Sequence, residues 1–430
     1  MAAVAAVVKY DNNERFTNMK RVVITGMGTV NPLGSNLETF WENVKKGTLG
    51  ISKIDAFDTT ELGVSVAGII RDFDPTEYFE RKDIRHMERF TQLAVASAVQ
   101  ALRDCGTDFK DLDIYRLGTI IGCGIGGIGR IEEEHTKYAA KGPGRISPFF
   151  VPMMIGNMAA GQVAIRTGFR GDNFCTTTAC ASSTHAVGEA FRKIKDGYLD
   201  VCLAGGSEST ITEFTLGGFR TMKALSTEAD PAKASTPFDL NRGGFVLSEG
   251  AAVLVLEEYE HAKARGAKIY AEIAGYGATC DAYHMTAPAD ECGASSRAMI
   301  NAYKEAGLQP EDITYINAHG TSTHLNDMLE TKAVKIALGE EQARKVKINS
   351  TKSMTGHMLG GTGAVEAVVS ALSIHDDFIH QTIGFTTPDP ECDLDYCTDG
   401  PVEMPVKAAL SNSLGFGGHN ATLCFKKCVD

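Results

Sequence analysis

The chain has 430 residues, of which 43% are hydrophobic and 22% charged, and its formal net charge at pH 7 is −12. This length exceeds what one hydrophobic core usually serves, so we expect two domains or two fused halves. The negative charge argues against a nucleic-acid-binding surface, although a local basic patch can still bind an acidic partner.

The eleven cysteines contain no CxxC pair, and no secretory segment precedes them. A disulfide framework and a zinc site are therefore not expected, and the cytoplasm is the expected location. Residues 1–18 are predicted to be an N-terminal extension, because Asp11 and Glu14 interrupt their short apolar run. No stretch is long enough to be expected to insert into a membrane.

Folded structure is expected to begin at residues 22–28, a short buried strand that ends in a glycine turn. Residues 91–102 have helical spacing, and buried strands are predicted at residues 117–123, 200–204 and 251–256. This alternation of strands and helices indicates an α/β protein with largely parallel sheets. The glycine-rich run at residues 122–129 is similar to a dinucleotide-binding turn. It lies in mid-chain without the acidic residue that such a site needs, which disfavours a nucleotide site.

Cys180 lies where a strand-like run breaks into small residues and a helical pattern begins. From Ala186 the apolar residues recur at helical spacing, so Cys180 is predicted at or near a helix N-terminus. The partial positive charge of that terminus favours a thiolate. The alternative is an inert packed cysteine.

A second half is expected to start near residues 267–273, which divides the chain into an N-terminal half, 19–267, and a C-terminal half, 268–430. Residues 346–350, 351–357 and 364–372 repeat the strand, small-residue turn and buried helix around Cys180. This echo predicts a duplicated α/β unit whose two turns face each other.

The second half supplies two histidines in turns that follow strands. A strand at residues 312–317 runs into His319, and His357 lies in a glycine-flanked turn. Strands of α/β proteins deliver functional residues at such positions, which makes both histidines candidates, with an ordinary hydrogen-bonded role as the alternative. His324 and His419 are expected to be structural or solvent-facing.

Six segments together resemble the β-ketoacyl-[acyl-carrier-protein] synthases of the thiolase superfamily, most closely the type II enzymes of bacterial fatty-acid synthesis. They are VITGMG (23–28), ISPFF (146–150), TAC (178–180), NAHGTST (317–323), STKSMTGH (350–357) and GFGGHN (415–420). The resemblance runs from about residue 20 to 427. It implies a thiolase fold, with duplicated βαβαβαβ halves in a five-layer αβαβα arrangement, and a homodimer.

The resemblance also implies the reaction, a decarboxylative Claisen condensation of a malonyl thioester with a Cys-bound acyl chain that elongates fatty acids. Cys180 would carry the acyl group, and His319 and His357 would donate hydrogen bonds to the enolate that forms on decarboxylation. The N–H groups of Cys180 and Phe416 would form the oxyanion hole. Neither a cofactor nor a metal is implied, because acyl carrier protein brings both substrates on its phosphopantetheine arm.

Further residues take roles only through this resemblance. Lys352 and Glu366 would support the histidines, and Thr321 and Thr323 would bind the pantetheine arm. An acyl tunnel with mobile gates would be lined by Ile125, Phe219 and Phe416, and acyl carrier protein would dock on Lys82, Arg85, Arg145 and Lys223. The alternatives are solvated charges, turn-capping threonines and plain core residues.

Three departures from the family pattern concern loop shape and substrate range. Residues 181–185 replace a stretch that usually contains glycine, His324 stands where proline is usual, and His419 stands where threonine is frequent. One alternative function is a polyketide-type ketosynthase. Another is a coenzyme A-dependent thiolase-like acyltransferase, and His357 disfavours this second alternative. A non-catalytic chain-length-factor subunit is a third, and Cys180 argues against it.

Overall fold

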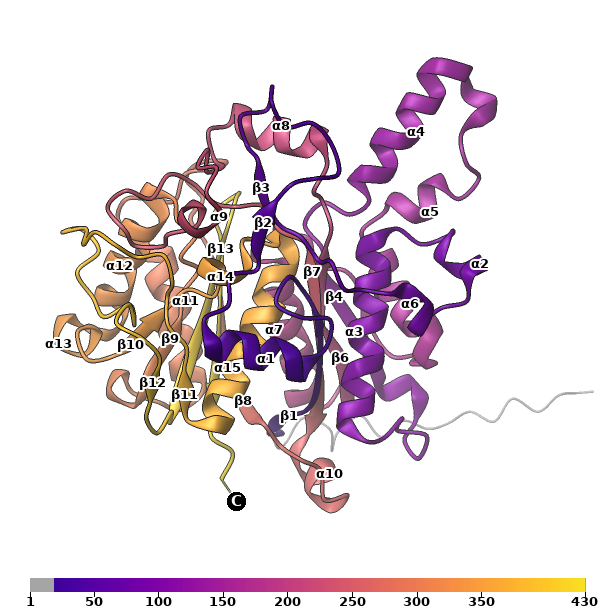
Figure 1. The fold of residues 1–430 in the computed structure, drawn as a ribbon. Helices are drawn as coiled ribbons and strands as arrows, with labels where there is room; N and C mark the ends of the chain where they lie inside the picture. Colours follow the sequence, from indigo (N-terminus) through magenta and orange to yellow (C-terminus); the bar gives the residue numbers. More distant parts are fainter. Residues whose placement is uncertain (1–18, 430) are drawn as a thin grey trace, which may run out of the picture.

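The computed structural model describes residues 19–429, so the predicted extension at residues 1–18 lies outside the described part. Ten strands form one continuous sheet at the centre of the molecule, in the order β10-β9-β13-β14-β8-β1-β7-β6-β4-β5 (Figure 1). The strands of the first half are β1 (Val22–Val30), β4 (Leu117–Gly122), β5 (Asn173–Phe174), β6 (Val201–Glu208) and β7 (Gly250–Glu258). Those of the second half are β8 (Ala271–Cys280), β9 (Tyr315–Asn317), β10 (Lys347–Asn349), β13 (Ala408–Gly415) and β14 (His419–Lys426).

The sheet is symmetrical about the pair of β1 and β8. On either side of this pair the strands follow the same plan, with β7 matching β14, β6 matching β13, β4 matching β9 and β5 matching β10. The predicted duplication is therefore confirmed. The expectation of largely parallel sheets is wrong, because the central pairings from β6 through β7, β1, β8 and β14 to β13 are all antiparallel. Only the three outer strands of each half run parallel.

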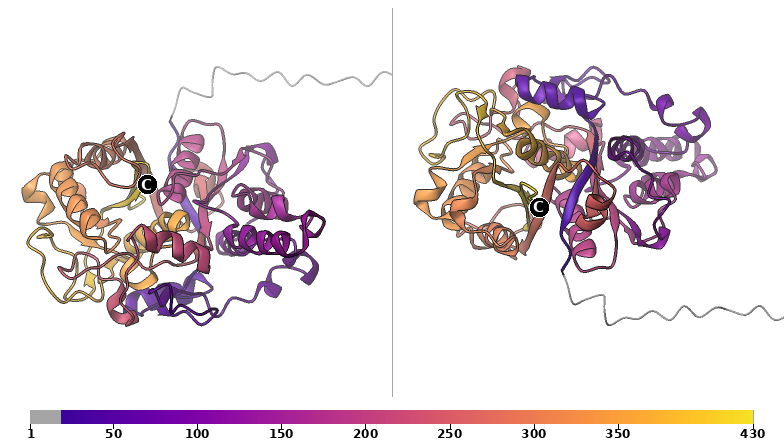
Figure 2. Two further views of the ribbon diagram at one scale, coloured as in Figure 1. Left: turned by 90° about the horizontal axis from the view of Figure 1, so that it is seen from above. Right: turned by 90° about the horizontal axis from the view of Figure 1, so that it is seen from below.

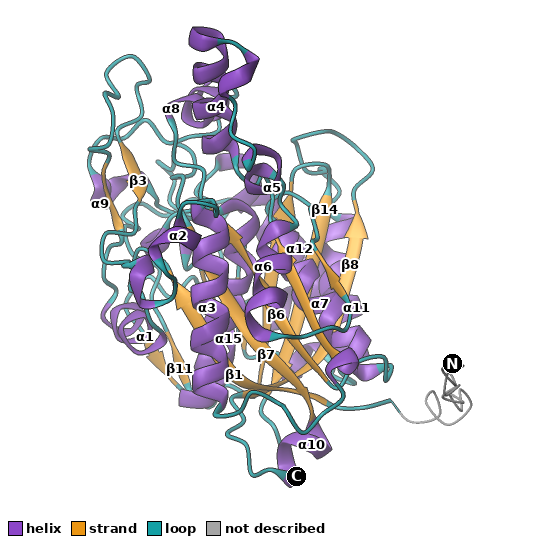
Figure 3. Cartoon of the chain, turned by 90° about the vertical axis from the view of Figure 1, so that its right-hand side faces the viewer, coloured by secondary structure: helices purple, strands orange, loops and turns teal. Residues whose placement is uncertain are grey.

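The two halves of the sheet form two of the five layers expected of the fold, and helices on their outer faces and between them form the other three. Helices α3 (Arg89–Cys105) and α6 (Met158–Thr167) cover the outer face of the first half, and α11 (Gly293–Glu305) and α12 (His324–Leu338) cover that of the second. Figure 2 shows these two groups on opposite sides of the molecule, and Figure 3 shows α3 and α6 in front of the strands. Helices α7 (Ser182–Lys195) and α15 (Thr362–Asp376) fill the middle layer.

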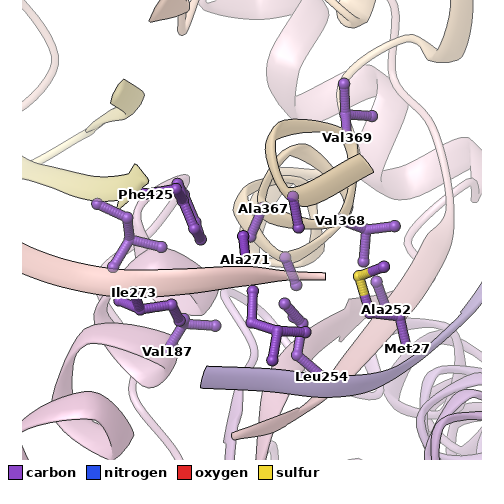
Figure 4. Close-up of a cluster of buried hydrophobic side chains, with 14 of the residues drawn as sticks. Met27, Val187, Ala252, Leu254, Ala271, Ile273, Ala367, Val368, Val369 and Phe425 are labelled. Carbon is purple, nitrogen blue, oxygen red and sulfur yellow. The ribbon is translucent and has the colours of Figure 1, made fainter. Parts of the chain in front are cut away.

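The position of α15 in the middle layer follows from its amino-acid composition. Residues 362–374 of α15 are all buried, because apart from Glu366, which pairs with Lys352, they are apolar or small on every side. A helix without a polar face is stable only when it is covered all round. Figure 4 shows Ala367, Val368 and Val369 of this helix among side chains of the neighbouring strands, such as Leu254 and Ile273.

The remaining elements lie around this core. They are α1 (Leu37–Lys46), α2 (Arg81–Ile84), α4 (Ile128–Lys141), α5 (Phe150–Met154), α8 (Glu213–Thr221), α9 (Pro231–Ala234), α10 (Tyr259–Ala264), α13 (Glu340–Ala343), α14 (Lys352–Thr355), β2 (Ile51–Lys53), β3 (Val66–Gly68), β11 (Phe378–Ile379) and β12 (Val402–Glu403). Among the described residues, no helix has both the length and the apolar character needed to cross a bilayer.

Candidate active site

The candidate site lies at the carboxyl ends of the outer parallel strands, where α/β sheets usually bind ligands. Cys180 follows β5 and precedes α7, while His319 follows β9. His357 follows β10 and α14 and precedes α15. The two turns that the sequence predicts to face each other therefore do so, one from each half.

The three side chains meet at one point. One side-chain atom from each of Cys180, His319 and His357 lies within 4.8 Å of the corresponding atoms of the other two. The two imidazole rings are 5.4 Å apart between centroids and nearly perpendicular. All three residues are buried, with at most 8% of their surface exposed. Such a group can hold one small substrate moiety between a sulfur and two ring nitrogens.

Both histidines are held in their neutral form. Burial, together with the positive charge of Lys352, lowers the pKa of His319 and His357 well below the usual value. His357 Nδ1 lies 3.0 Å from the hydroxyl of Thr362, and its Nε2 has no partner in the structure. A neutral imidazole whose Nδ1 accepts a hydrogen bond from Thr362 carries its proton on Nε2 and can donate it to a substrate oxygen.

The sulfur of Cys180 differs from the sequence-based expectation of a thiolate. Burial raises the pKa of Cys180 to about 12, an effect larger than the stabilisation by Lys352 and by the backbone N–H groups of Phe416 and Cys180. Glu208 opposes the thiolate further. Burial therefore favours the thiol over the thiolate. The helix-terminus argument considers only local charge, whereas desolvation in the assembled fold is the larger effect.

Lys352 forms the buried ion pair that the resemblance implies. Its Nζ donates to Glu366 Oε1 at 2.6 Å, and both side chains are 1% exposed. Burial raises the pKa of Glu366 to about 7, partly opposed by Lys352. The pair lies beneath the site, and the charge of Lys352 acts on both histidines and on the cysteine.

The residue types Cys, His and His also suit zinc. However, the buried ammonium of Lys352 already lowers the histidine pKa values, and the same charge would oppose a divalent cation between them. We therefore do not propose a metal at this site.

A cavity of about 800 Å³ contains the three side chains. Thr321, Thr323 and Phe416 line it, and the Thr321 and Thr323 hydroxyls are 2.8 Å apart. Ile125 and Phe219 line both this cavity and a second one of about 820 Å³ on their other side. Ile125 and Phe219 thus border both the inner chamber and the outer apolar chamber, whereas Phe416 lines the inner chamber alone.

The four candidate docking residues are more widely separated than the residues that line the cavity. Lys223 follows α8 and lines the cavity, whereas Lys82 and Arg85 lie on or just after α2 and Arg145 lies in a short turn before α5. All four are exposed, and Lys82 pairs with Glu80 at 2.9 Å. Only Lys223 is thus in direct contact with the site.

Glu208 is a residue that the sequence reasoning missed. Its carboxylate accepts hydrogen bonds from the N–H groups of Gly124, Ile125 and Gly126, which belong to the glycine-rich run. An internal carboxylate thus occupies the amides that a bound phosphate would need, in agreement with the sequence evidence against a nucleotide site. An acidic residue at the end of the apolar strand at residues 201–208 is the signal that could have identified it.

Glu330 was also missed. It is fully buried on α12 and accepts hydrogen bonds from the N–H groups of His319 and Gly320, both at 2.8 Å. It fixes the backbone that presents His319. His324 and His419, expected to be structural or solvent-facing, lie respectively on the first turn of α12 with an exposed side chain and at the start of β14 beside His185.

Family models for the beta-ketoacyl synthase N-terminal and C-terminal domains match residues 19–262 and 270–386. A 3-oxoacyl-[acyl-carrier-protein] synthase 2 of Staphylococcus aureus (strain N315) is 50% identical over 95% of this chain and 98% of its own length. The enzyme with that name from Synechocystis sp. is 48% identical over the same shares.

Among solved structures, a ketosynthase in complex with the acyl-carrier protein of a type II polyketide synthase matches with a TM-score of 0.89. It is 35% identical, over 96% of this chain and 100% of its own. The chain therefore belongs to the β-ketoacyl synthase family, which confirms the predicted thiolase fold and condensing activity.

Proposed function

We propose that this chain elongates fatty acids as a 3-oxoacyl-[acyl-carrier-protein] synthase of the second type, with Cys180 as nucleophile and His319 and His357 as enolate-stabilising donors. The observation that carries the proposal is the meeting of these three buried side chains, one from the first half and two from the second, in one cavity. Identity of 50% to synthases of this type, against 35% to the polyketide ketosynthase, favours the fatty-acid reaction over the polyketide one.

In the first step, the Cys180 sulfur attacks the carbonyl carbon of an acyl thioester on acyl carrier protein. A carbon–sulfur bond forms to Cys180, the bond to the carrier's sulfur breaks, and the carrier thiol leaves with the proton that Cys180 gives up. Because burial favours the thiol form of Cys180, the proton leaves as the bond forms. The N–H groups of Cys180 and Phe416, which already act on the sulfur, stabilise the oxyanion of the tetrahedral intermediate.

In the second step, malonyl thioester loses carbon dioxide, and the electron pair of the broken bond becomes an enolate. Neutral His319 and His357 stabilise it by donating N–H bonds to the thioester oxygen, and no strong base is needed. The enolate carbon attacks the acyl carbon on Cys180. A carbon–carbon bond forms, and the electron pair of the carbon–sulfur bond returns to Cys180, which takes up a proton from solvent water.

Lys352 is proposed to act as a positioning residue. Paired with Glu366, it places a positive charge near the site. Burial first and this charge second lower the pKa of both imidazoles, so that each stays neutral with one nitrogen free to donate. Thr321 and Thr323 would bind the pantetheine arm along the cavity wall. Ile125, Phe219 and Phe416 would gate the acyl chamber, and no cofactor takes part in this reaction.

Acyl carrier protein is the proposed partner, supported by the neighbouring ketosynthase that was solved with one. Such a carrier would dock on the exposed cations Lys82, Arg85, Arg145 and Lys223, of which Lys223 lines the cavity itself. A homodimer is proposed as well. Strand β5 ends the central sheet, and apolar side chains are exposed nearby on or between α4, α5 and α6, namely Ile131, Tyr138, Ile146, Phe149, Val151 and Ile165. The boundary between halves at residues 267/268 and the cytoplasmic location remain predictions.

The roles of the three side chains are tested by separating the two half-reactions. Cys180→Ala and Cys180→Gln should both abolish condensation, while Cys180→Gln, whose amide imitates an acylated cysteine, should still release carbon dioxide from malonyl-[acyl-carrier-protein]. Condensation that persists in Cys180→Ala would overturn the proposal.

A further inference from the structure

Glu208 is a buried carboxylate for which the reaction described above has no role. It is the last residue of β6, it is 0% exposed, and it has no ion-pair partner within residues 19–429. Burying a carboxylate without a counter-ion costs several kcal/mol unless strong hydrogen bonds compensate. Such a group is retained where the donors that surround it must be held together.

The donors come from two segments that are far apart in the sequence. Glu208 Oε2 accepts from Gly124 N at 2.7 Å and from Gly360 N at 3.1 Å. Glu208 Oε1 accepts from Ile125 N at 3.2 Å, from Gly126 N at 3.1 Å and from the thiol of Cys123 at 3.3 Å. One oxygen therefore bridges the two segments, and the other holds the first segment alone.

The bridge is close enough to exclude any side chain. A Cβ at Gly360 would lie 2.3 Å from Gly124 N and 2.8 Å from Glu208 Oε2, and a Cβ at Gly124 would lie 2.8 Å from the same oxygen. The two segments can therefore approach this closely only with glycine at both position 124 and position 360. This close backbone approach is a second observation, besides the hydrogen bonds, that the two segments are joined at Gly124, Gly360 and Glu208, which we call the junction.

Each segment carries a wall of the site. The first, residues 123–126, carries Ile125, which lines both chambers. The second, residues 358–361, directly follows His357 and carries Leu359, which lines the cavity beside Cys180 and has a φ of 45°. Few positions with a side chain adopt such a φ, so the surrounding contacts must maintain it.

We propose that Glu208 is a positioning residue that locks the gate segment 123–126 to segment 358–361, so that the acyl tunnel and the decarboxylation site change together. This inference rests on the proposed function, since it assigns acyl selectivity to Ile125 and decarboxylation to His357. It predicts that the two properties cannot be altered separately by changes at this junction.

Glu208→Gln tests the lock sharply, because neither orientation of the amide can satisfy all the donors. With its NH2 in the place of Oε2, the N–H groups of Gly124 and Gly360 lose their acceptor. With its NH2 in the place of Oε1, those of Ile125 and Gly126 lose theirs. The first orientation breaks the bridge to Gly360, whereas the second keeps the bridge and frees only the N–H groups of Ile125 and Gly126. Gly360→Ala therefore disturbs the bridge whichever way the amide turns.

The matched control is Glu257→Gln. Glu257 is also 0% exposed, and it accepts from Thr25 Oγ1 at 2.7 Å and pairs with Arg265 at 2.7 Å, at the opposite end of β7 from the site. It should lower the urea midpoint of unfolding as Glu208→Gln does, without changing selectivity. The comparison separates loss of the lock from general loss of stability.

The measurement is kcat/KM for acyl-[acyl-carrier-protein] from medium to long chains, together with malonyl decarboxylation in the absence of an acyl donor. In Glu208→Gln, the ratio of kcat/KM between long and medium chains should change by about tenfold or more, and decarboxylation should fall. In Glu257→Gln, both should stay as in the parent. Gly360→Ala should reproduce the Glu208→Gln profile, and the double variant should add little, because both changes break one junction.

Two results overturn the inference: a Glu208→Gln profile of the parent's shape lowered by one factor, or additive effects in the double variant. A parent chain that condenses no substrate would instead refute the proposed function, so the two failures are distinguishable. If Glu208→Gln is too unstable to assay, Gly360→Ala alone decides, since it leaves the carboxylate in place.

Discussion

Replacing Ile125 by phenylalanine should shorten the acyl chains that the enzyme accepts. Ile125 is 40% exposed and lies between the chamber that contains Cys180 and the outer apolar chamber of about 820 Å³. On the proposed function, a chain that outgrows the first chamber passes this side chain into the second. The larger ring fills space that the packed walls cannot easily surrender.

The size of the effect follows from the methylenes that are kept out. Each methylene that stays in water instead of the outer chamber loses about 0.8 kcal/mol. Four excluded methylenes therefore cost about 3 kcal/mol, or roughly a hundredfold in kcat/KM, since about 1.4 kcal/mol is a factor of ten. Chains that end before Ile125 should lose nothing.

The assay is kcat/KM across acyl lengths from medium to long for Ile125→Phe and the parent. Ile128→Phe should affect only the longest chains, because Ile128 lines the outer chamber alone, and Ile336→Phe, on the exposed face of α12, should change nothing. Profiles of Ile125→Phe and the parent that differ only in height would show that the tunnel does not pass Ile125.

Three further predictions concern the histidines and the partner. His319→Ala or His357→Ala should lower malonyl decarboxylation by roughly 10²–10³-fold, the cost of one preorganised oxyanion donor, while self-acylation of Cys180 persists; full decarboxylase activity in both variants would refute their role. Both histidines have a pKa below their unfolded value of about 6.5, so the unfolded chain binds more protons below that pH and stability falls as pH drops through it. Each should contribute up to about 1.4 kcal/mol per pH unit, and urea midpoints at pH 7.5 and 5.5 should therefore fall less in the double His→Asn variant than in the parent; an equal fall would contradict this. Lys82→Glu with Arg85→Glu should raise KM for the carrier-bound substrate and weaken its salt dependence, and an unchanged salt dependence would count against this docking surface.

The sequence predicts the local elements well and the sheet pairing poorly. The strand predicted at residues 117–123 is β4, and the helix predicted at 91–102 is part of α3. Local periodicity reports which residues are buried but not which way the neighbouring strand runs, so the antiparallel centre of the sheet was missed. The duplication of the two halves was predicted correctly, because it can be read from the repeated sequence pattern without knowing how the strands pair.

The site shows the same limit. The spacing of small residues, strands and glycines made Cys180, His319 and His357 candidates, and the family resemblance joined them into one triad, which the structure brings together. The protonation state of Cys180 was not predictable, because it depends on burial by segments distant in the sequence. Glu208 was missed for a related reason, since its donors lie more than eighty residues before it and about 150 after it.

The central claim is that Cys180 carries the acyl group delivered by acyl carrier protein. The most direct test is intact-mass and peptide mass analysis after incubation with acyl-[acyl-carrier-protein] and, separately, with acyl-coenzyme A. We predict one acyl group per chain from the carrier-bound donor, located on the peptide that contains Cys180 and on none of the other ten cysteines, and no mass shift in Cys180→Ala. Acylation of a different cysteine, or an equal mass shift in Cys180→Ala, would contradict the account.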